Sequence, residues 1–409
     1  MKARLSYHNV PERKYSITIP GSKSESNRLL ILQALFPKFT INNLSSSDDT
    51  QSLINGLKVI KGTVDVHHAG TAMRFLTAYY ASKKGAEITI TGSHRMQERP
   101  IKILVDALRD LGAEITYLKN EGYPPLKIKG KNLEKSSLKI NSGVSSQYIT
   151  ALMLIAPSLK NGLKIELIGE VTSSPYIEMT IELLHKAGVT CSFLNNTIVV
   201  KPIDEVNDVA IEVESDWSSA SYFYSIVALS ESMEITLKNF NQNSFQGDSE
   251  LSKIYKSFGV ETVYNISENA ITLKKNNKNI KPLNLHLNNT PDIAQTIAVT
   301  CFGLGIACKL TGLKTLKIKE TDRLLALKTE LEKLGAKIKI SDESIEVFSS
   351  SVIKNNILIN TYQDHRMAMA FAPLSLLIKI EIDKPDVVSK SYLTFWDDLQ
   401  KIGITVQIK

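Results

Sequence analysis

The chain has 409 residues and a mass of 45.4 kDa, and its 43% hydrophobic and 22% charged residues are typical of an ordinary globular protein. This length exceeds the size at which one hydrophobic core usually stops growing, so we expect two domains. The formal net charge of +7, without a continuous run of Lys and Arg interleaved with aromatic residues, favours a small anionic partner over nucleic acid.

The sequence also argues against a membrane protein, an exported protein and a redox protein. The apolar runs are all shorter than the roughly 20 residues that cross a bilayer, and segment 1–15 is polar, without the apolar core of an export signal. We therefore expect a cytoplasmic protein with no membrane partner. Cys191, Cys301 and Cys308 lie in apolar or strand-like surroundings, and we expect buried structural thiols rather than a metal or redox site.

The first segment that indicates chemistry is a helix start within 20–30. A Pro-Gly pair ends the preceding segment, and Ser22 is a natural N-cap for the apolar run that follows. Lys23 and Arg28 therefore lie at or just inside a helix N-terminus, where the helix dipole disfavours cations. Free backbone N–H groups together with two cations predict a phosphate or carboxylate site, and a solvated basic cap is the open alternative.

Two patterns then alternate along the chain. In the first, an apolar helix is followed by a glycine that requires positive φ and by an alternating strand, at intervals of about 70 to 75 residues. These glycines are Gly112, Gly188, Gly259, Gly335 and Gly403. In the second, a short polar start precedes a helix rich in small residues, which indicates helices packed inside a domain. The second set spans 22–35, 69–81, 145–156, 215–229, 290–303 and 362–376.

The periodicity predicts six units of strand, helix, strand, helix, strand and strand. Only about 47 residues separate Lys23 from Gly70, so we expect the first unit to lack one hairpin. Three units per domain give an N-terminal-type domain at 20–214 and a C-terminal-type domain at 1–19 plus 215–409. The N-terminal strand could belong to either domain. The predicted class is therefore α/β (α+β), with two crossovers between the domains.

Equivalent helix starts of a structural repeat lie on a common face, so we expect their polar groups to converge when the domains close. The helix starts contribute Lys23, Ser24, Arg28, His68, Gly70, Thr71, Arg74, Ser145, Ser146, Gln147, Asp216, Ser218, Ser219, Asp292, Asp364, His365 and Arg366, with charged loops at 95–100 and 317–323. Arg binds carboxylate or phosphate bidentately, and this excess of cations predicts one or two small phosphorylated acids. Because metal-binding and dinucleotide motifs are missing from the sequence, we expect no metal and no bound dinucleotide.

Six motifs, in order between residues 20 and 390, resemble the 5-enolpyruvylshikimate-3-phosphate synthase family, the 3-phosphoshikimate 1-carboxyvinyltransferases. They are PGSKSESNR (20–28), AGTAMR (69–74), RMQERP (95–100), SSQ (145–147), KETDR (319–323) and DHRMAM (364–369). The resemblance implies two domains of three βαβαββ units around buried helices. It also implies transfer of the carboxyvinyl group of phosphoenolpyruvate to the 5-hydroxyl of shikimate 3-phosphate, with release of phosphate, by a monomer without a cofactor. This reaction belongs to the shikimate pathway, which leads to chorismate and the aromatic amino acids.

The resemblance further implies roles for matching residues. Asp292 resembles the base that accepts the 5-hydroxyl proton, Glu320 the acid that protonates the methylene carbon, and Lys23 a catalytic cation. A cation-rich site keeps Asp292 ionised, so Glu320 must be kept protonated by burial, by a nearby carboxylate or by substrate charge. The implied shikimate 3-phosphate ligands are Ser24, Arg28, Ser145, Ser146, Gln147 and Ser173. The implied phosphoenolpyruvate ligands are Lys23, Gly70, Arg99, Arg323, Arg366 and Lys390, and Lys319 is a further substrate ligand.

Some residues depart from the family pattern or favour a structural interpretation. His68 stands where the family usually has Asn, and it is either a ligand or a structural histidine; Thr315 and Leu393 are further departures. We expect Asp364 to be a helix cap, and Asp48 and Asp49 to be ordinary caps or solvated acids.

Two alternative functions share much of this pattern. The UDP-N-acetylglucosamine carboxyvinyltransferases usually carry Lys-Asn after the first glycine and a reactive Cys in the segment that corresponds to 92–100. Here Ser24 follows Lys23, and that segment has no Cys. A non-catalytic anion or RNA-end binder would also use Arg and Lys, but it would have no need of the pair Asp292 and Glu320.

Overall fold

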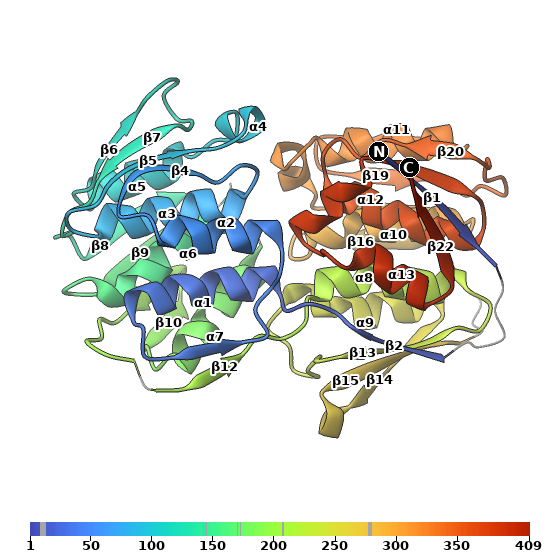
Figure 1. The fold of residues 1–409 in the computed structure, drawn as a ribbon, viewed down its shortest axis with the longest axis horizontal. Coiled ribbons are helices and arrows are strands. Elements are labelled where there is room, and N and C mark those ends of the chain that lie inside the picture. The colour runs from blue at the N-terminus through green and yellow to red at the C-terminus, as the bar shows by residue number, and fades with distance from the viewer. Residues whose placement is uncertain are drawn as a thin grey trace. The chain divides into compact units, whose positions relative to one another are not determined.

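The computed structural model describes residues 1–8, 14–141, 143, 145–169, 171, 173–206, 208–276 and 280–409. The chain divides into two compact units of helices and sheets (Figure 1). Unit 1 comprises Met1–Pro20 and Glu214–Lys409, and unit 2 comprises Gly21–Val213. Of the helices in the described residues, none is long and apolar enough to cross a membrane.

Two repeats of unit 2 each form a complete four-stranded sheet. The first has the strand order β4(Lys61–Asp65), β5(Glu87–Thr91), β7(Leu126–Lys129) and β6(Glu114–Tyr117). The second has the order β8(Ser137–Asn141), β9(Leu163–Ile168), β11(Thr197–Val200) and β10(Cys191–Leu194). In both, the first two strands pair in parallel and the last two form an antiparallel hairpin. The helices between them are α3(Gly70–Ser82), α4(His94–Gln97), α5(Lys102–Asp110), α6(Ser146–Ile155), η1(Ala156–Ser158) and α7(Ser174–Lys186).

The first repeat of unit 2 is shortened, as predicted. It contains α1(Lys23–Leu35), β3(Thr40–Asn42) and α2(Asp48–Leu57), and within the fully described stretch 14–141 the chain runs from α2 directly to β4, without a hairpin. β12(Ala210–Glu212) returns from the end of the unit and pairs in parallel with β3. The strand that opens this repeat therefore comes from the far end of unit 2.

In its described residues, unit 1 forms three four-stranded sheets. Their orders are β2(Lys14–Thr18), β13(Glu234–Lys238), β15(Ala270–Lys275) and β14(Val260–Asn265); β16(Leu283–His286), β17(Cys308–Thr311), β19(Ile345–Val347) and β18(Ile338–Ile340); and β20(Ile357–Ile359), β21(Ile380–Asp383), β1(Lys2–Tyr7) and β22(Ile404–Ile408). β2 opens the first sheet in parallel with β13, whereas β1 closes the third by antiparallel pairing with β21 and β22. Both N-terminal strands thus belong to unit 1.

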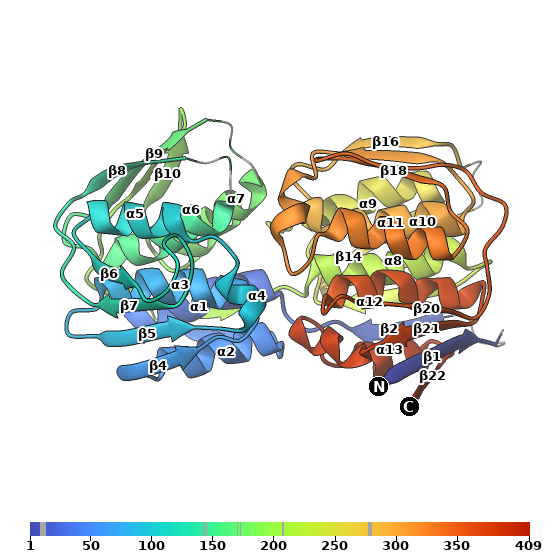
Figure 2. The same ribbon diagram turned by 90° about the horizontal axis from the view of Figure 1, so that it is seen from above.

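The helices of unit 1 follow the same repeat. They are α8(Trp217–Leu229), η2(Gly247–Glu250), α9(Leu251–Ile254), η3(Tyr255–Phe258), η4(Ile266–Glu268), η5(Pro291–Ile293), α10(Ala294–Gly303), η6(Lys314–Ile318), α11(Arg323–Lys333), α12(His365–Phe371), η7(Ala372–Leu376), η8(Pro385–Lys390) and α13(Phe395–Lys401). Within each unit, helices lie between the sheets (Figure 2).

The helices rich in small residues form the cores, as predicted. Every residue of α12 is buried, and all of α8 except Ser218 is buried. The outer helices are amphipathic: α5 buries one face, with Leu104, Val105 and Leu108, and exposes charged residues on the other. The five predicted glycines follow these outer helices with φ between 73° and 106°, and the three cysteines are buried and unpaired. The prediction of an α/β fold built from repeats is therefore confirmed.

Candidate active site

The start of α1 has the capping geometry that the sequence predicts. The Ser22 hydroxyl accepts a hydrogen bond from the Glu25 N–H at 3.4 Å, so Lys23 and Ser24 occupy the first turn. Lys23 Nζ lies 3.2 Å from Asp49 Oδ2, in the first turn of α2. The interpretation of Asp49 as an ordinary cap or solvated acid is wrong, because α2 packs on α1 and buries this carboxylate beside Lys23.

Arg28 is a buried cation that ties three helices of unit 2 together. Its Nε donates to Thr180 Oγ1 at 2.9 Å, and its Nη1 donates to the Ser24 carbonyl at 2.7 Å. Nη2 donates to the Tyr176 carbonyl at 3.3 Å and to Thr150 Oγ1 at 3.4 Å. Burial lowers the pKa of Arg28 to about 10, which still leaves it charged at neutral pH. These contacts fix the starts of α1 and α7 against each other.

Gly70 and Arg99 form a close pair at the start of α3. A Cβ added to Gly70 would lie only 2.6 Å from Arg99 Nη1 and 3.1 Å from Arg99 Cζ, so the guanidinium rests on the glycine. Arg99 is 8% exposed, and no residue in the described part of the chain accepts a hydrogen bond from its buried Nε. A buried cation with an unused donor is expected where an anionic ligand binds. Arg74, by contrast, donates to the Pro100 carbonyl at 2.8 Å.

The remaining predicted residues of unit 2 lie at the starts of α6 and α7. Ser145 caps α6 by accepting from the Gln147 N–H at 3.3 Å, and Ser146 is the first helical residue. Gln147 Nε2 donates to Thr71 Oγ1 at 3.4 Å, which joins the starts of α6 and α3. Ser173 precedes α7 with φ of 57° and is buried. The structure therefore places the residues predicted from this half of the chain at or just before the starts of α1, α3, α5, α6 and α7.

In unit 1, Arg323 is the centre of a buried ionic cluster. Its Nη1 lies 2.9 Å from Asp292 Oδ1, its Nη2 2.9 Å from Glu320 Oε2, and its Nε 2.7 Å from Asp364 Oδ2. Burial alone would lower the pKa of Arg323, but the charges of Asp364, Glu320 and Asp292 outweigh it and raise this pKa. Arg323 is therefore a permanent cation held between three carboxylates.

Asp292 is held by two further cations. Lys319 Nζ lies 3.4 Å from its Oδ1, and Arg366 Nη2 lies 3.3 Å from its Oδ2. Burial acts to raise the pKa of Asp292, but Arg366, Lys319 and Arg323 outweigh burial and hold this pKa well below its ordinary value. Burial lowers the pKa of Lys319, and the charge of Asp292 opposes that change. Asp292 is thus ionised at neutral pH.

The other carboxylates of the cluster have distinct partners. Glu320 Oε1 pairs with Lys390 Nζ at 3.0 Å, while its Oε2 faces Arg323. Asp364 Oδ1 accepts from the Arg366 N–H at 2.9 Å, which confirms the helix cap predicted there. Asp364 also binds Arg323, so the cap holds a charged side chain in place. The predicted residues of unit 1 therefore form one connected cluster.

Asp248 and Ser218 extend this cluster beyond the predicted binding residues. Arg366 Nη2 donates to Ser218 Oγ at 3.2 Å, and the Ser218 hydroxyl donates to Asp248 Oδ2. Burial raises the pKa of Asp248 to about 7, with Asp292 adding to the shift and Arg366 opposing it. Asp248 was not predicted from the sequence, because the polar segment 241–250 is typical of a loop and only the fold places Asp248 beside Ser218.

The three departures from the family pattern occupy different environments. His68 Nδ1 lies 2.8 Å from Ser93 Oγ, and its ring packs edge-on to His67 at 4.1 Å. Thr315 Oγ1 is buried and has no hydrogen-bond partner within the described residues. Leu393 is exposed, so its side chain leaves the core packing unaffected.

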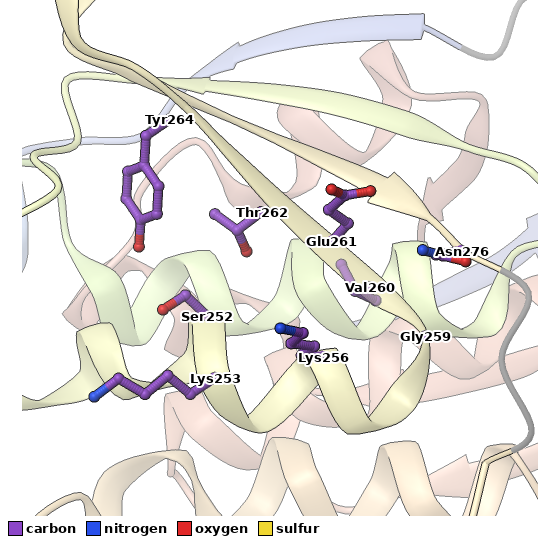
Figure 3. A pocket seen from close by; sticks show the side chains of 9 residues that line it. All are labelled: Ser252, Lys253, Lys256, Gly259, Val260, Glu261, Thr262, Tyr264 and Asn276. Atoms are coloured by element: carbon purple, nitrogen blue, oxygen red, sulfur yellow. The ribbon is translucent and has the colours of Figure 1, made fainter.

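A cavity of about 670 Å³ lies elsewhere on unit 1, between α9, η3 and β14 (Figure 3). Its lining residues are Ser252, Lys253, Lys256, Gly259, Val260, Glu261, Thr262, Tyr264 and Asn276. None of the predicted site residues is among them. The cavity therefore provides no support for their roles.

The repeat-built α/β units carry buried cations at their helix starts, an arrangement that suits the binding of small anions. The family model described as EPSP synthase (3-phosphoshikimate 1-carboxyvinyltransferase) matches residues 60–399. The chain belongs to the EPSP synthase family, which confirms the resemblance drawn from the six motifs.

Individual relatives agree with this assignment. The chain is 46% identical over 399 residues to the 3-phosphoshikimate 1-carboxyvinyltransferase of Bacteroides fragilis, with 97% of each chain covered. It is 35% identical over 438 residues to the protein of the same name from Mannheimia haemolytica, with 98% of this chain and 99% of the relative covered. The solved structure of EPSP synthase from Acinetobacter baumannii matches all of both chains with a TM-score of 0.78 at 19% identity, which supports the fold.

Proposed function

We propose that the protein transfers the carboxyvinyl group of phosphoenolpyruvate to the 5-hydroxyl of shikimate 3-phosphate and releases phosphate. The reaction supplies the shikimate pathway towards chorismate and the aromatic amino acids. Family membership supports it, and so does one observation above all: Asp292 and Glu320 both contact the guanidinium of Arg323, each at 2.9 Å. Two carboxylates on one buried cation suit proton transfer beside a bound anion, whereas a simple binder needs only the cations.

The anionic groups of phosphoenolpyruvate have candidate partners in both units. Lys23, Gly70 and Arg99 serve in unit 2, where the Nε of Arg99 has no acceptor among the residues that the structure describes. The partners in unit 1 are Lys319, Arg323, Arg366 and Lys390. Shikimate 3-phosphate is held by hydroxyl, amide and guanidinium groups at the helix starts of unit 2, namely Ser24, Arg28, Ser145, Ser146, Gln147 and Ser173.

The reaction proceeds by addition and then elimination. Asp292 accepts the proton of the 5-hydroxyl while the hydroxyl oxygen bonds to C2 of phosphoenolpyruvate. Glu320 gives a proton to the methylene carbon of phosphoenolpyruvate. Lys23 stabilises the anionic tetrahedral intermediate. The methyl carbon then returns a proton to Glu320, the carbon–carbon double bond reforms, and the C–O bond breaks so that phosphate leaves with its electron pair.

The charges around Asp292 and Glu320 connect substrate binding to these roles. Cations hold the pKa of Asp292 low, which keeps it able to accept a proton but makes it a weak base. Substrate anions that bind Arg366 and Lys319 offset these cations and strengthen the base. Glu320 must likewise give up one of its two cationic partners and gain a proton when the substrates bind.

We further propose that the domains are 20–214 and 1–19 plus 215–409, and that the protein acts as a cytoplasmic monomer without a cofactor. Its partners are then the two small-molecule substrates, and neither nucleic acid nor a membrane takes part. The net charge of +7 is consistent with anionic substrates.

The test is phosphate release in the presence of phosphoenolpyruvate with shikimate 3-phosphate, with each compound alone as a control. We expect release only with both, and a Lys23→Met variant should lose at least about 100-fold in turnover if Lys23 supplies electrostatic stabilisation. Release with UDP-N-acetylglucosamine in place of shikimate 3-phosphate would support the other transferase. Binding of both ligands without turnover would support a non-catalytic binder.

A further inference from the structure

The segment that leads into α12 has an unfavourable backbone conformation. Tyr362 and Gln363 have φ of 54° and 57°, in the left-handed region that non-glycine residues seldom adopt. They immediately precede Asp364, the cap of α12, and Arg366, which contacts Asp292. Two such residues in succession require contacts that hold them in place.

Glu330 of α11 provides these contacts at one end of the segment. It is fully buried, its Oε1 accepts from the Tyr362 hydroxyl at 2.6 Å, and its Oε2 accepts from the Asn360 N–H at 3.0 Å. Lys333 Nζ lies 2.6 Å and 2.8 Å from the two oxygens and offsets the buried charge. Tyr362 remains 38% exposed, so its hydroxyl rather than core packing fixes it.

Arg323 holds the other end from the same helix. It donates to Asp364 Oδ2 at 2.7 Å and to Oδ1 at 3.3 Å. Arg323 and Glu330 lie about two turns apart, so they project from one side of α11. Side chains of one helix, α11, therefore bind the segment on both sides of Tyr362 and Gln363.

We propose that Glu330 and Tyr362 form a latch that positions Arg366 for the anionic substrate. They are positioning residues, because their contacts are with the segment and not with the ionic cluster itself. If the latch opens, Tyr362 and Gln363 can relax to negative φ, which redirects the start of α12 and removes Arg366 from Asp292 and Ser218. The inference rests on the proposed function, which makes Arg366 a phosphoenolpyruvate ligand.

The latch predicts a particular kinetic signature. Without the latch, only a fraction of the molecules holds Arg366 in place, and the apparent affinity for phosphoenolpyruvate falls in proportion to that fraction. Bound substrate restores the arrangement, so the chemical step is preserved. The KM for phosphoenolpyruvate should therefore rise while kcat stays nearly constant.

The test compares Tyr362→Phe with Tyr224→Phe. The control removes a hydroxyl of the same unit that lies 2.8 Å from Thr262 Oγ1, on the sheet side of α8. We expect Tyr362→Phe to raise the KM for phosphoenolpyruvate about five- to tenfold with kcat within about twofold, in line with the loss of one ordinary hydrogen bond made by a partly exposed hydroxyl. Tyr224→Phe should leave both constants unchanged.

A second readout needs no turnover. Phenylglyoxal labelling, mapped by mass spectrometry, should modify Arg366 several times faster in Tyr362→Phe than in the wild type, with the exposed Arg4 as internal standard. Adding Gln363→Asn, a residue that tolerates the left-handed region better, should restore part of the protection. An unchanged labelling rate overturns the latch, whether or not the enzyme turns over. Failure of the wild type to release phosphate contradicts the proposed function alone, and the labelling comparison then decides on the latch.

Discussion

At the scale of single residues, the site depends on buried cations whose surroundings leave little room. The Arg99 guanidinium fills the space that a side chain on Gly70 would need, and Arg366 contacts both Asp292 and Ser218. A buried guanidinium or carboxylate is stable only while its partners stay in place. Small changes around these groups should therefore alter ligand affinity before they alter the fold.

Gly70→Ala tests the contact with Arg99. The new methyl group would lie 2.6 Å from Arg99 Nη1, so the flexible guanidinium must move away from the start of α3. We expect the KM for phosphoenolpyruvate to rise about tenfold, equivalent to about 1.4 kcal/mol, with a much smaller change in the KM for shikimate 3-phosphate. Gly85→Ala is the kinetic control: its φ of 85° strains the backbone, but the added methyl group meets no atom within 4 Å, so neither KM should change. Equal effects on the two substrates would contradict the assignment.

Asp248 predicts a specific dependence of stability on pH. Burial raises its pKa in the folded protein to about 7, from 3.8 in the unfolded reference. Between these values the folded state binds more protons than the unfolded state, so this group reduces stability as pH rises, by roughly 4 kcal/mol at most. Above pH 7 both states are ionised and the loss stays constant. Asp248→Asn removes the loss, so its stability relative to the wild type should improve between about pH 4 and about pH 7.

Urea unfolding at several pH values measures this difference. Asp342→Asn is the control, because the Asp342 side chain is 93% exposed and should show no such gain. A constant stability difference between Asp248→Asn and the wild type across this range would show that folding does not raise the pKa of Asp248.

The cationic residues were predictable, but their partners were not. Lys23, Arg323 and Arg366 stand within short motifs, and their positions at helix starts follow from capping patterns. Asp49 pairs with Lys23, 26 positions away in the chain, and Asp248 is linked to Arg366 through Ser218, which lies 30 positions from Asp248. Which of several acidic residues faces a cation depends on how two helices pack, and local sequence does not record that.

At the scale of elements, the outer helices of the five later repeats each end at a glycine that turns the chain into the next strand. Gly112 has φ of 106°, and a Cβ there would meet no atom within 4 Å. Gly112→Ala should therefore destabilise the protein by about 1 kcal/mol through backbone strain alone, without a change in kinetics. Gly112→Asn should cost less, because Asn tolerates positive φ better. Urea unfolding measures the loss of stability in both variants. Equal losses in Gly112→Ala and Gly112→Asn would show that the positive φ of residue 112 is not the cause of the destabilisation.

At the scale of the whole molecule, periodicity predicted the repeats but not how they are completed. The regular spacing of helices and glycines identified six units and the shortened first one. The strands that complete them come from elsewhere: β1 pairs with β21 and β22 near the C-terminus, and β12 pairs with β3. An alternating pattern of apolar and polar residues predicts a strand and its buried face, but it does not identify the strand with which it pairs.

The most direct test of the account is the product formed in heavy water. Phosphoenolpyruvate and shikimate 3-phosphate are incubated with the enzyme in D₂O, and the product is analysed by mass spectrometry and NMR. Protonation of the methylene carbon by Glu320, followed by loss of a proton from the resulting methyl group, predicts a carboxyvinyl product that carries deuterium in its vinyl CH₂. No carboxyvinyl product, or one that contains only protium, would contradict transfer by addition and elimination.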